Sequence, residues 1–306
     1  MPRAMNYGRL PTERANPRTR RLDQLPLPRL LQLMTDEDAR MLRAVRSQHA
    51  SIARAIQLIT SSLRSGGRLF FAGAGTSGRL GILEAAECPP TFHTPPSTVQ
   101  ALIAGGPRAV FRSREGAEDR RTEARRAIRR RVRAGDVVVG IAASGVTPFV
   151  EEALREAGRR NAKTVLVTCA ANSPLRSTVR IAANVGPEVL TGSTRLKAGT
   201  ATKLILNMLT LGTMVRLGKT YGNLMVDVRP TSRKLRARAR RIVQSLAGGS
   251  DRAAEAQLRA ARDRVKTAVV MAACGLGYSA ATRRLGRFGG SLREALEHDA
   301  PRGRRR

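Results

Sequence analysis

The chain of 306 residues contains no tryptophan, three tyrosines and six phenylalanines, so it lacks the aromatic platform on which single-stranded bases usually stack. Its three cysteines and three histidines are far apart, without the CxxC or paired-histidine spacing of a zinc site or a disulfide framework. No cofactor motif stands out either. The sequence therefore argues against a zinc site and gives no sign of a cofactor.

Long apolar runs are also missing. No stretch of eighteen apolar residues occurs, and the N-terminal sequence MPRAMNYGRL has no apolar core of a signal peptide. Apolar residues nevertheless make up 42% of the chain, enough to fill a core in one large domain or two ordinary ones. These features predict a cytoplasmic globular protein that does not contact a membrane.

Acidic residues are few. Asp and Glu number 23 against 56 Lys and Arg, which gives a formal net charge of +33, and all but six of the basic residues are arginine. They are spread through the chain, so we interpret them mostly as solvated surface and consider nucleic-acid binding unlikely. An arginine-rich helix predicted over residues 116–133 is read in the same way, with a docking face for a polyanion as the alternative.

Short, continuous apolar runs alternate with helical patterns over most of the chain. Such runs are typical of a parallel sheet that is buried on both faces, as in α/β proteins. One helix is predicted from a cap at Thr35 to Gly66, and the chain beyond Thr200 is predicted to be helical. The strands are predicted at Leu69–Ala72, Val99–Ala104, Val137–Ala142, Thr164–Thr168 and Arg180–Asn184.

Changes in pattern suggest four parts. Residues 1–25 are rich in proline and arginine and read as an extended arm, and residues 26–245 form the α/β domain. The break at Gly248, Gly249 and Ser250 separates a small helical subdomain, residues 246–300. Residues 301–306, PRGRRR, are predicted to be a disordered tail.

The first predicted strand leads into a glycine-rich turn, GAGTSG, followed by a helix that Pro89 and Pro90 should end. Glycines allow close approach of a ligand, and the free N–H groups of a helix N-terminus suit phosphate. The turn also carries the hydroxyls of Thr76 and Ser77. It is neither a Walker loop nor a clear dinucleotide fingerprint, and alone it is explained equally well by packing.

Two further turns carry hydroxyl groups. Ser144, Gly145 and Thr147 follow the third strand, where a helix cap is the simpler explanation. Ser193, Thr194 and the cation Lys197 precede the long apolar helix that follows. Because the carboxyl ends of parallel strands meet at one edge of a sheet, the three turns together imply a phosphorylated, hydroxyl-rich small ligand.

Carboxylates close to these turns supply acid and base groups. Glu87 follows the first turn by one helix, and Glu118 lies after the second strand; for Glu84, Glu115 and Asp119 an exposed position on a helix is the simpler reading. The residues alone do not choose among these acids. Cys88 is interpreted as a small buried side chain rather than a nucleophile.

The segments GAGTSGRLGILEAAECPPTF, EGAED, VVVGIAASGVTPF, TGSTRLKAGTATK and GKTYGNLMVDV occur in this order, and with LPTERANPRTRRLDQL they extend over nearly the whole chain. Together they resemble the N-acetylmuramic acid 6-phosphate etherase family. The resemblance implies the sugar isomerase (SIS) fold, a five-stranded parallel sheet between helices, to which the glucokinase regulatory protein is also similar. It also implies a homodimer.

The same resemblance implies an activity: the lactyl ether is cleaved by elimination and water then adds, without a metal or redox cofactor. Glu87 is implied as the acid and Glu118 as the base, although this division of roles is open. The residues implied to line the sugar phosphate pocket are Thr76, Ser77, Ser144, Gly145, Thr147, Ser193 and Thr194, with Lys197 nearby. A non-catalytic sugar phosphate regulator of the same fold is the alternative.

Three positions depart from the family pattern. The family usually has Arg at Val146, Gly at His93, and Asn-Pro at Ala170 and Ala171. Loss of the Arg is expected to weaken binding of the substrate if that side chain points into the pocket.

Overall fold

The computed structural model describes residue 8 and residues 10–298, and these divide into two compact units. The first is an α/β unit that includes residues 10–86 and 96–211. The second is helical and includes residues 87–95 and 212–298, so it is larger than the predicted segment 246–300. The predicted tail, 301–306, and the first seven residues of the predicted arm lie outside the described residues.

The α/β unit is built on one parallel sheet with the strand order β2-β1-β3-β4-β5. All five predicted strands are confirmed, with ends that differ by one or two residues. Strand residues are buried on both faces, which is why the strands read as continuous apolar runs. The strands are β1 (Leu69–Gly73), β2 (Val99–Ile103), β3 (Val137–Ile141), β4 (Lys163–Thr168) and β5 (Val179–Ala182).

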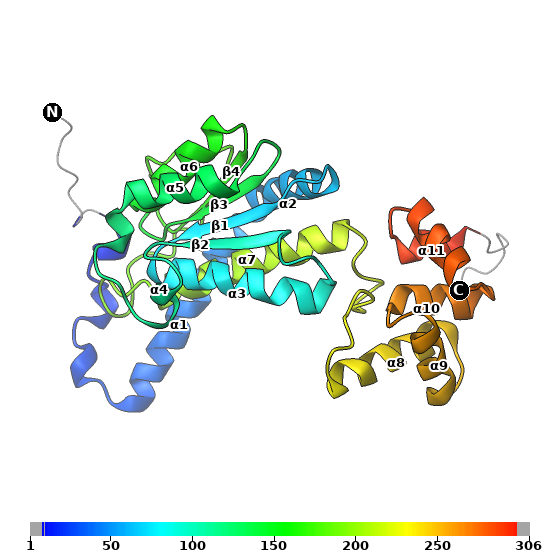
Figure 1. Cartoon of the computed structure of the whole chain (residues 1–306). Helices are drawn as coiled ribbons and strands as arrows, with labels where there is room; N and C mark the ends of the chain where they lie inside the picture. The colour runs from blue at the N-terminus through cyan, green and yellow to red at the C-terminus, as the bar shows by residue number, and fades with distance from the viewer. Residues whose placement is uncertain (1–7, 9, 299–306) are drawn as a thin grey trace. The chain divides into compact units, whose positions relative to one another are not determined.

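Helices cover both faces of the sheet (Figure 1). On one face α5 (Arg121–Arg131) and α6 (Pro148–Arg159) pack against a core that includes Phe70, Val138 and Leu166. On the other lie α3 (Gly75–Phe92) and α7 (Lys197–Arg216), and Gly81 of α3 approaches Phe71 so closely that a Cβ would meet it at 2.8 Å. The remaining elements of this unit are η2 (Pro11–Glu13), η3 (Pro17–Thr19), η4 (Leu22–Gln24), α1 (Leu27–Arg46), α2 (His49–Arg64), α4 (Arg108–Phe111) and η5 (Ala117–Asp119).

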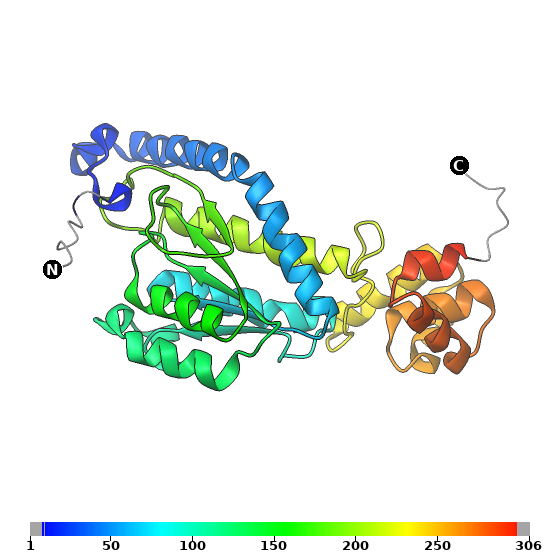
Figure 2. The ribbon, with the colours of Figure 1, turned by 90° about the horizontal axis from the view of Figure 1, so that it is seen from above.

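The predicted helix from Thr35 to Gly66 is wrong at its start and in its continuity. Helix α1 begins at Leu27 with a proline in its first turn, and Thr35 lies inside it with its hydroxyl donating to the Gln32 carbonyl at 2.8 Å. The chain then breaks before α2, as the blue helices in Figure 2 show. At the break, Gln48 accepts a hydrogen bond from the Ala182 backbone N–H at 3.0 Å, which ties it to β5.

Pro89 and Pro90 do not end α3, contrary to the prediction: the helix continues to Phe92. The two prolines remove two N–H donors from the last turns, and the His93 N–H closes the helix on the Pro89 carbonyl at 3.0 Å. His93 itself has φ +52°, the left-handed conformation that usually follows a helix end.

The predicted arginine-rich helix is shorter than expected and only partly solvated. It comprises the 3-10 turn η5 and helix α5, and three of its arginines pair with acids on α6. Like charges along α5 are therefore offset by neighbouring carboxylates rather than by solvent alone. The pairs are Arg121–Glu151 (2.7 Å), Arg125–Glu152 (2.6 Å) and Arg129–Glu156 (2.7 Å).

The helical unit has its own core, which includes Val226, Ile242, Leu258, Val269 and Leu285. Among the residues the structure describes, no single helix is long and apolar enough to cross a membrane; α10 and α11, bent by 107°, meet the length and composition criteria only as a pair. The helices after α7 are α8 (Arg233–Ala247), α9 (Asp251–Ala260), α10 (Val265–Cys274), α11 (Tyr278–Arg287) and α12 (Leu292–Glu297).

Candidate active site

A cavity of about 540 Å³ lies in the α/β unit, at the carboxyl edge of the sheet where β1 and β3 end. This is the edge at which ligands bind in open parallel sheets. Its walls come from the N-terminal arm, the β1–α3 turn, η5, the β3–α6 turn and the loop before α7. The lining residues are Leu10, Glu13, Ala74, Gly75, Thr76, Ser77, Glu118, Asp119, Ala143, Ser144, Val146, Thr147, Pro148, Gly192 and Thr194.

Hydroxyl groups dominate the polar lining. Thr76, Ser77, Ser144, Thr147 and Thr194 all line this cavity, and none of them makes a side-chain hydrogen bond with another described residue. Thr147 occupies the N-cap position of α6, yet its side chain accepts no capping bond. The simple capping explanation therefore fails for Thr147, and five hydroxyls remain available to a ligand.

Gly145 shapes the second turn without lining the cavity. Its φ of +73° favours glycine, and a Cβ there would meet the Ser173 side chain at 2.7 Å. The Ser173 hydroxyl donates to the Gly145 carbonyl at 2.6 Å, and the Gly145 N–H donates to Ala142 at 2.9 Å. These contacts hold the turn so that Ser144 and Thr147 both face the cavity.

The third loop contributes less than the sequence suggested. Thr194 and Gly192 line the cavity, whereas Ser193 does not. The N-terminus of α7 is already occupied, because the buried Glu188 carboxylate accepts from the Lys197 and Ala198 backbone N–H groups, each at 3.0 Å. An internal carboxylate thus takes the place that a ligand anion would need at this helix end.

Lys197, predicted to supply positive charge to the pocket, is instead directed into the interior. Its ammonium group donates to the Glu37 carboxylate and to the Val185 carbonyl, and its side chain is only 2% exposed. Burial opposes ionisation of Glu37, but the hydrogen bond and charge of Lys197, with help from Arg40 and Asn16, outweigh it and lower the pKa of Glu37. Lys197 therefore joins α7 to α1.

Glu118 lies in the cavity wall on η5. The turn begins after Gly116, whose left-handed φ of +68° brings the chain round. Although the Glu118 side chain stays exposed at the rim, partial burial of the carboxyl raises its pKa, and the charges of Asp119 and Glu115 raise it further. A carboxylate whose pKa is shifted toward neutrality is suited to proton transfer.

The other nearby acids divide between the cavity and the interior. Asp119 and Glu13 line the cavity with Glu118. Glu84, read from the sequence as an exposed helix residue, is instead buried: Lys203 and Thr210 of α7 hydrogen-bond to it, the latter at 2.7 Å. Glu84 therefore holds α3 against α7.

Glu87 and Cys88 follow on α3, in the part that belongs to the helical unit. Glu87 is exposed and Cys88 is buried, as a small core side chain would be. That Glu87 and Glu118 act on one substrate stays a prediction from the sequence.

The lining of the cavity carries three carboxylates, and within the part of the chain described here it includes no lysine or arginine. Nor do the described residues contain a group of three or more His, Cys, Asp or Glu side chains arranged to hold a metal ion. The groups that can receive a phosphate here are hydroxyls and backbone N–H groups at the starts of α3 and α6.

Comparison with known proteins gives the same fold and a more specific family. Residues 51–157 match the model of the glucokinase regulatory protein N-terminal SIS domain, and residues 120–212 match the SIS domain. An N-acetylmuramic acid 6-phosphate etherase of Mycolicibacterium smegmatis is 50% identical, over 95% of this chain and 99% of that protein. One from Gloeobacter violaceus is 51% identical, over 94% of this chain and 95% of that protein.

The chain belongs to the N-acetylmuramic acid 6-phosphate etherase family. The phosphoheptose isomerase of Francisella tularensis shares the fold: it superposes on 62% of this chain and 98% of its own with a TM-score of 0.50, at 17% identity. The predicted SIS-type architecture is thus confirmed.

Two departures from the etherase family pattern have a structural reading. His93 adopts φ +52°, a conformation that glycine reaches without strain and histidine only occasionally, which fits the glycine that the resemblance implies here. Val146 lines the cavity, so the arginine that the resemblance implies would add a cation to a wall that has no lysine or arginine among the described residues.

The N-terminal arm was the main omission of the sequence reasoning. Leu10 and Glu13 line the cavity, although residues 1–25 are predicted only as an extended arm with no part in the site. The signal for this contribution is the segment LPTERANP, one of the segments that carry the family resemblance.

Proposed function

We propose that this chain cleaves the D-lactyl ether of N-acetylmuramic acid 6-phosphate, giving N-acetylglucosamine 6-phosphate and D-lactate. The observation that carries the proposal is Glu118, a carboxylate with a raised pKa, in one cavity with five hydroxyls that have no partner among the described residues. About 50% identity to curated etherases over nearly the whole chain supports the same reading.

The phosphate is bound by the β1–α3 and β3–α6 turns. Thr76 and Ser77 lie in the first turn of α3, and Ser144 and Thr147 precede α6, so hydroxyl donors stand beside unpaired backbone N–H groups at both helix starts. This supports a phosphate held by neutral donors and helix dipoles rather than by a cationic side chain.

The chemistry requires one base and one acid. In the open-chain sugar the C2 proton is adjacent to the aldehyde, so Glu118 can remove it while the C3–oxygen bond breaks. Lactate leaves with its oxygen protonated by Glu87, and water then adds at C3, so one water is consumed overall. The assignment of these two roles follows the family resemblance.

The remaining expectations belong to the same proposal. We take the chain to act as a cytoplasmic homodimer, as the resemblance implies. Thr194 and Gly192, from the loop before α7, would contact the sugar rather than the phosphate. The N–H groups at the start of α7 already donate to Glu188, so this helix end cannot bind the phosphate.

Measuring D-lactate after incubation of the purified protein with N-acetylmuramic acid 6-phosphate tests the proposal. Glu118→Gln and Glu87→Gln are expected to reduce turnover by about 10² to 10⁴-fold. Asp23→Asn, an exposed acid of the arm that does not line the cavity, serves as the matched control. Lactate no higher than in the two Glu variants would contradict the etherase reading, and ligand-dependent thermal stabilisation without lactate would favour the regulator instead.

A further inference from the structure

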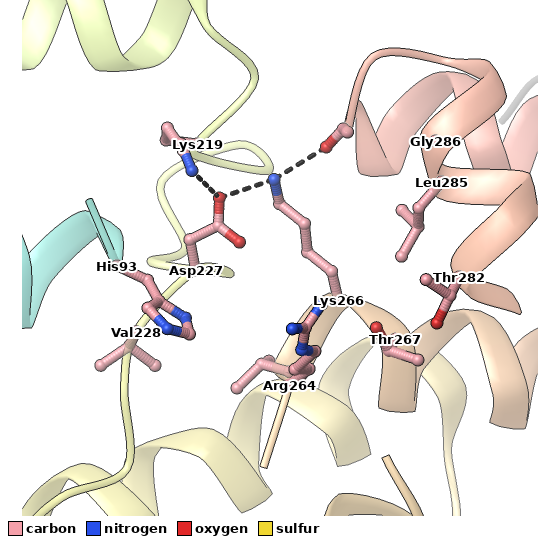
Figure 3. A pocket seen from close by; sticks show the side chains of 12 residues that line it. His93, Lys219, Asp227, Val228, Arg264, Lys266, Thr267, Thr282, Leu285 and Gly286 are labelled. Carbon is pink, nitrogen blue, oxygen red and sulfur yellow. Dashed lines mark hydrogen bonds and ion pairs between the residues drawn. The ribbon is translucent and has the colours of Figure 1, made fainter. Parts of the chain in front are cut away.

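The helical unit contains a second cavity, of about 390 Å³, that the proposed reaction does not use (Figure 3). It lies between the segment that carries Lys219 and Asp227, the start of α10, and α11. Three basic side chains, Lys219, Arg264 and Lys266, line it against the single carboxylate of Asp227. Its charge is therefore opposite in sign to that of the cavity with Glu118.

Figure 3 shows the Asp227 carboxylate between the two lysines. Its Oδ2 atom lies 2.7 Å from the Lys266 ammonium and 3.2 Å from that of Lys219. Lys266 is 8% exposed and also donates to the Gly290 carbonyl at 2.7 Å, which leaves one of its three N–H groups unused. One half-buried carboxylate thus pairs with two ammonium groups, and one positive charge of this trio is unbalanced.

Arg264 adds a second unbalanced charge. Its side chain is exposed, lines the cavity and makes no hydrogen bond or ion pair with another described residue. It occupies the N-cap position of α10 without capping it, and the first helical hydrogen bond is made by Ala268 to the Arg264 carbonyl at 2.9 Å. The N–H groups of Val265, Lys266 and Thr267 therefore have no partner within the helix.

The opposite wall supplies a polar group that lacks a partner. The Thr282 hydroxyl on α11 is buried and has no hydrogen-bond partner. A buried hydroxyl without a partner costs free energy, so it is informative when it borders a cavity that has room for a ligand. Such a hydroxyl can donate to an oxygen held at the start of α10.

We propose that this cavity binds a small dianionic oxyanion, inorganic phosphate or a phosphomonoester. Two unbalanced positive charges match a dianion, and the N-terminus of a ten-residue helix directs backbone N–H groups and a positive dipole end at it. Arg264 is the side chain that presents two parallel N–H donors to such a group. The site does not depend on the proposed etherase activity.

The pKa values of Lys266 and His93 support this reading of the cavity. Burial lowers the pKa of Lys266; Asp227 raises it, and Lys219 lowers it again. His93 faces the same cavity. Burial, followed by the positive charge of Arg229, lowers the pKa of His93, and among the neighbouring charges only Asp227 raises it. The surroundings thus disfavour the charged forms of Lys266 and His93, and an added anion would relieve this.

Titration calorimetry with inorganic phosphate tests the proposal on the full chain at constant ionic strength. The combined Ser144→Ala and Thr147→Val substitutions are used as background, since they weaken phosphate binding at the sugar phosphate cavity. In this background we expect one remaining phosphate site. Arg264→Gln should weaken it about ten- to a hundredfold, the range for loss of a charged hydrogen bond.

Arg283→Gln is the matched control, because Arg283 is an exposed arginine beside Thr282 that does not line the cavity. It should leave the phosphate affinity unchanged. Thr282→Val should weaken phosphate binding while the ligand-free protein keeps or gains stability, since only an unpartnered hydroxyl is lost. A structural role alone would not produce that combination.

The other outcomes overturn the proposal. They are the absence of phosphate binding in this background, equal weakening by Arg264→Gln and Arg283→Gln, and tighter binding of D-lactate than of phosphate at the same site. The last would assign the cavity to a carboxylate. Comparing inorganic phosphate with N-acetylglucosamine 6-phosphate distinguishes the free ion from a phosphomonoester.

Discussion

The Lys197 ammonium and the Glu37 carboxylate form an ion pair in the interior of the α/β unit, where their side chains are 2% and 3% exposed. Arg18 and Asn16 from the N-terminal arm donate to the same carboxylate, at 2.9 and 3.2 Å. One buried acid therefore joins α1, α7 and the arm that brings Glu13 to the cavity. Lys197, which was predicted to supply positive charge to the substrate pocket, instead stabilises the packing around that pocket.

Lys197→Met should destabilise the protein by about 3 to 5 kcal/mol, because it leaves the buried Glu37 charge without its main partner. The double variant Lys197→Met with Glu37→Met should lose less, since neither charge remains. Urea unfolding measures both, with Lys163→Met, an exposed lysine, as the control. If Lys197→Met is as stable as the parent but has a raised KM, Lys197 has a role in substrate binding instead.

The same cluster has an expected pH dependence. The pKa of Glu37 is lowered in the folded protein, so its ionised form contributes stability that is present above the ordinary pKa of 4.5 and is lost as the pH falls through the folded value. Glu37→Gln should flatten the fall in urea midpoint below pH 5 compared with the parent. An unchanged acid profile in the variant would count against the pair.

Glu13→Gln should raise KM by roughly tenfold and leave kcat nearly unchanged. The Glu13 carboxylate lines the cavity and accepts a hydrogen bond from Thr12 at 3.3 Å, which leaves lone pairs for a sugar hydroxyl. The loss of a hydrogen bond to a charged group sets the size of the effect. Steady-state lactate assays check it against Asp23→Asn, and a fall in kcat of a hundredfold would instead make Glu13 an acid or base.

The pH profile of kcat/KM should show the raised pKa of Glu118 as a limb above the ordinary value of 4.5. If Glu118 is the base, activity falls as the pH drops through that pKa; if it is the acid, activity falls as the pH rises through it. Asp119→Asn removes a negative neighbour and should move the limb to lower pH. A limb that stays in place would show that the titrating group is not Glu118.

The fold was largely predictable because its strands are buried on both faces. Phe70 and Phe71 point to opposite sides of β1, and both are buried, so the strand appears in the sequence as an uninterrupted apolar run. The three hydroxyl turns could be located from the same pattern, since each comes after a predicted strand or before a predicted helix. These features were predictable because neighbouring residues in the sequence determine them.

What the sequence could not give depends on contacts between distant residues. Lys197 pairs with Glu37, 160 positions away, and Glu84 with Thr210, 126 positions away; nothing near either acid shows that it is buried. Thr35 followed by acids resembles a helix start, but burial of Glu37 places that segment inside α1. Tertiary pairing overrode the local pattern in each case.

Val146→Arg should lower KM for the sugar phosphate by about tenfold. Val146 lines a cavity with three carboxylates and no described lysine or arginine, and the family resemblance implies an arginine at this position. An added guanidinium beside Ser144 and Thr147 can form a charge-assisted hydrogen bond with phosphate, and it reduces the repulsion between phosphate and Glu118. Val146→Met, similar in length but uncharged, should not change KM. If the arginine variant binds no more tightly than the methionine variant, the phosphate does not lie against the β3–α6 turn.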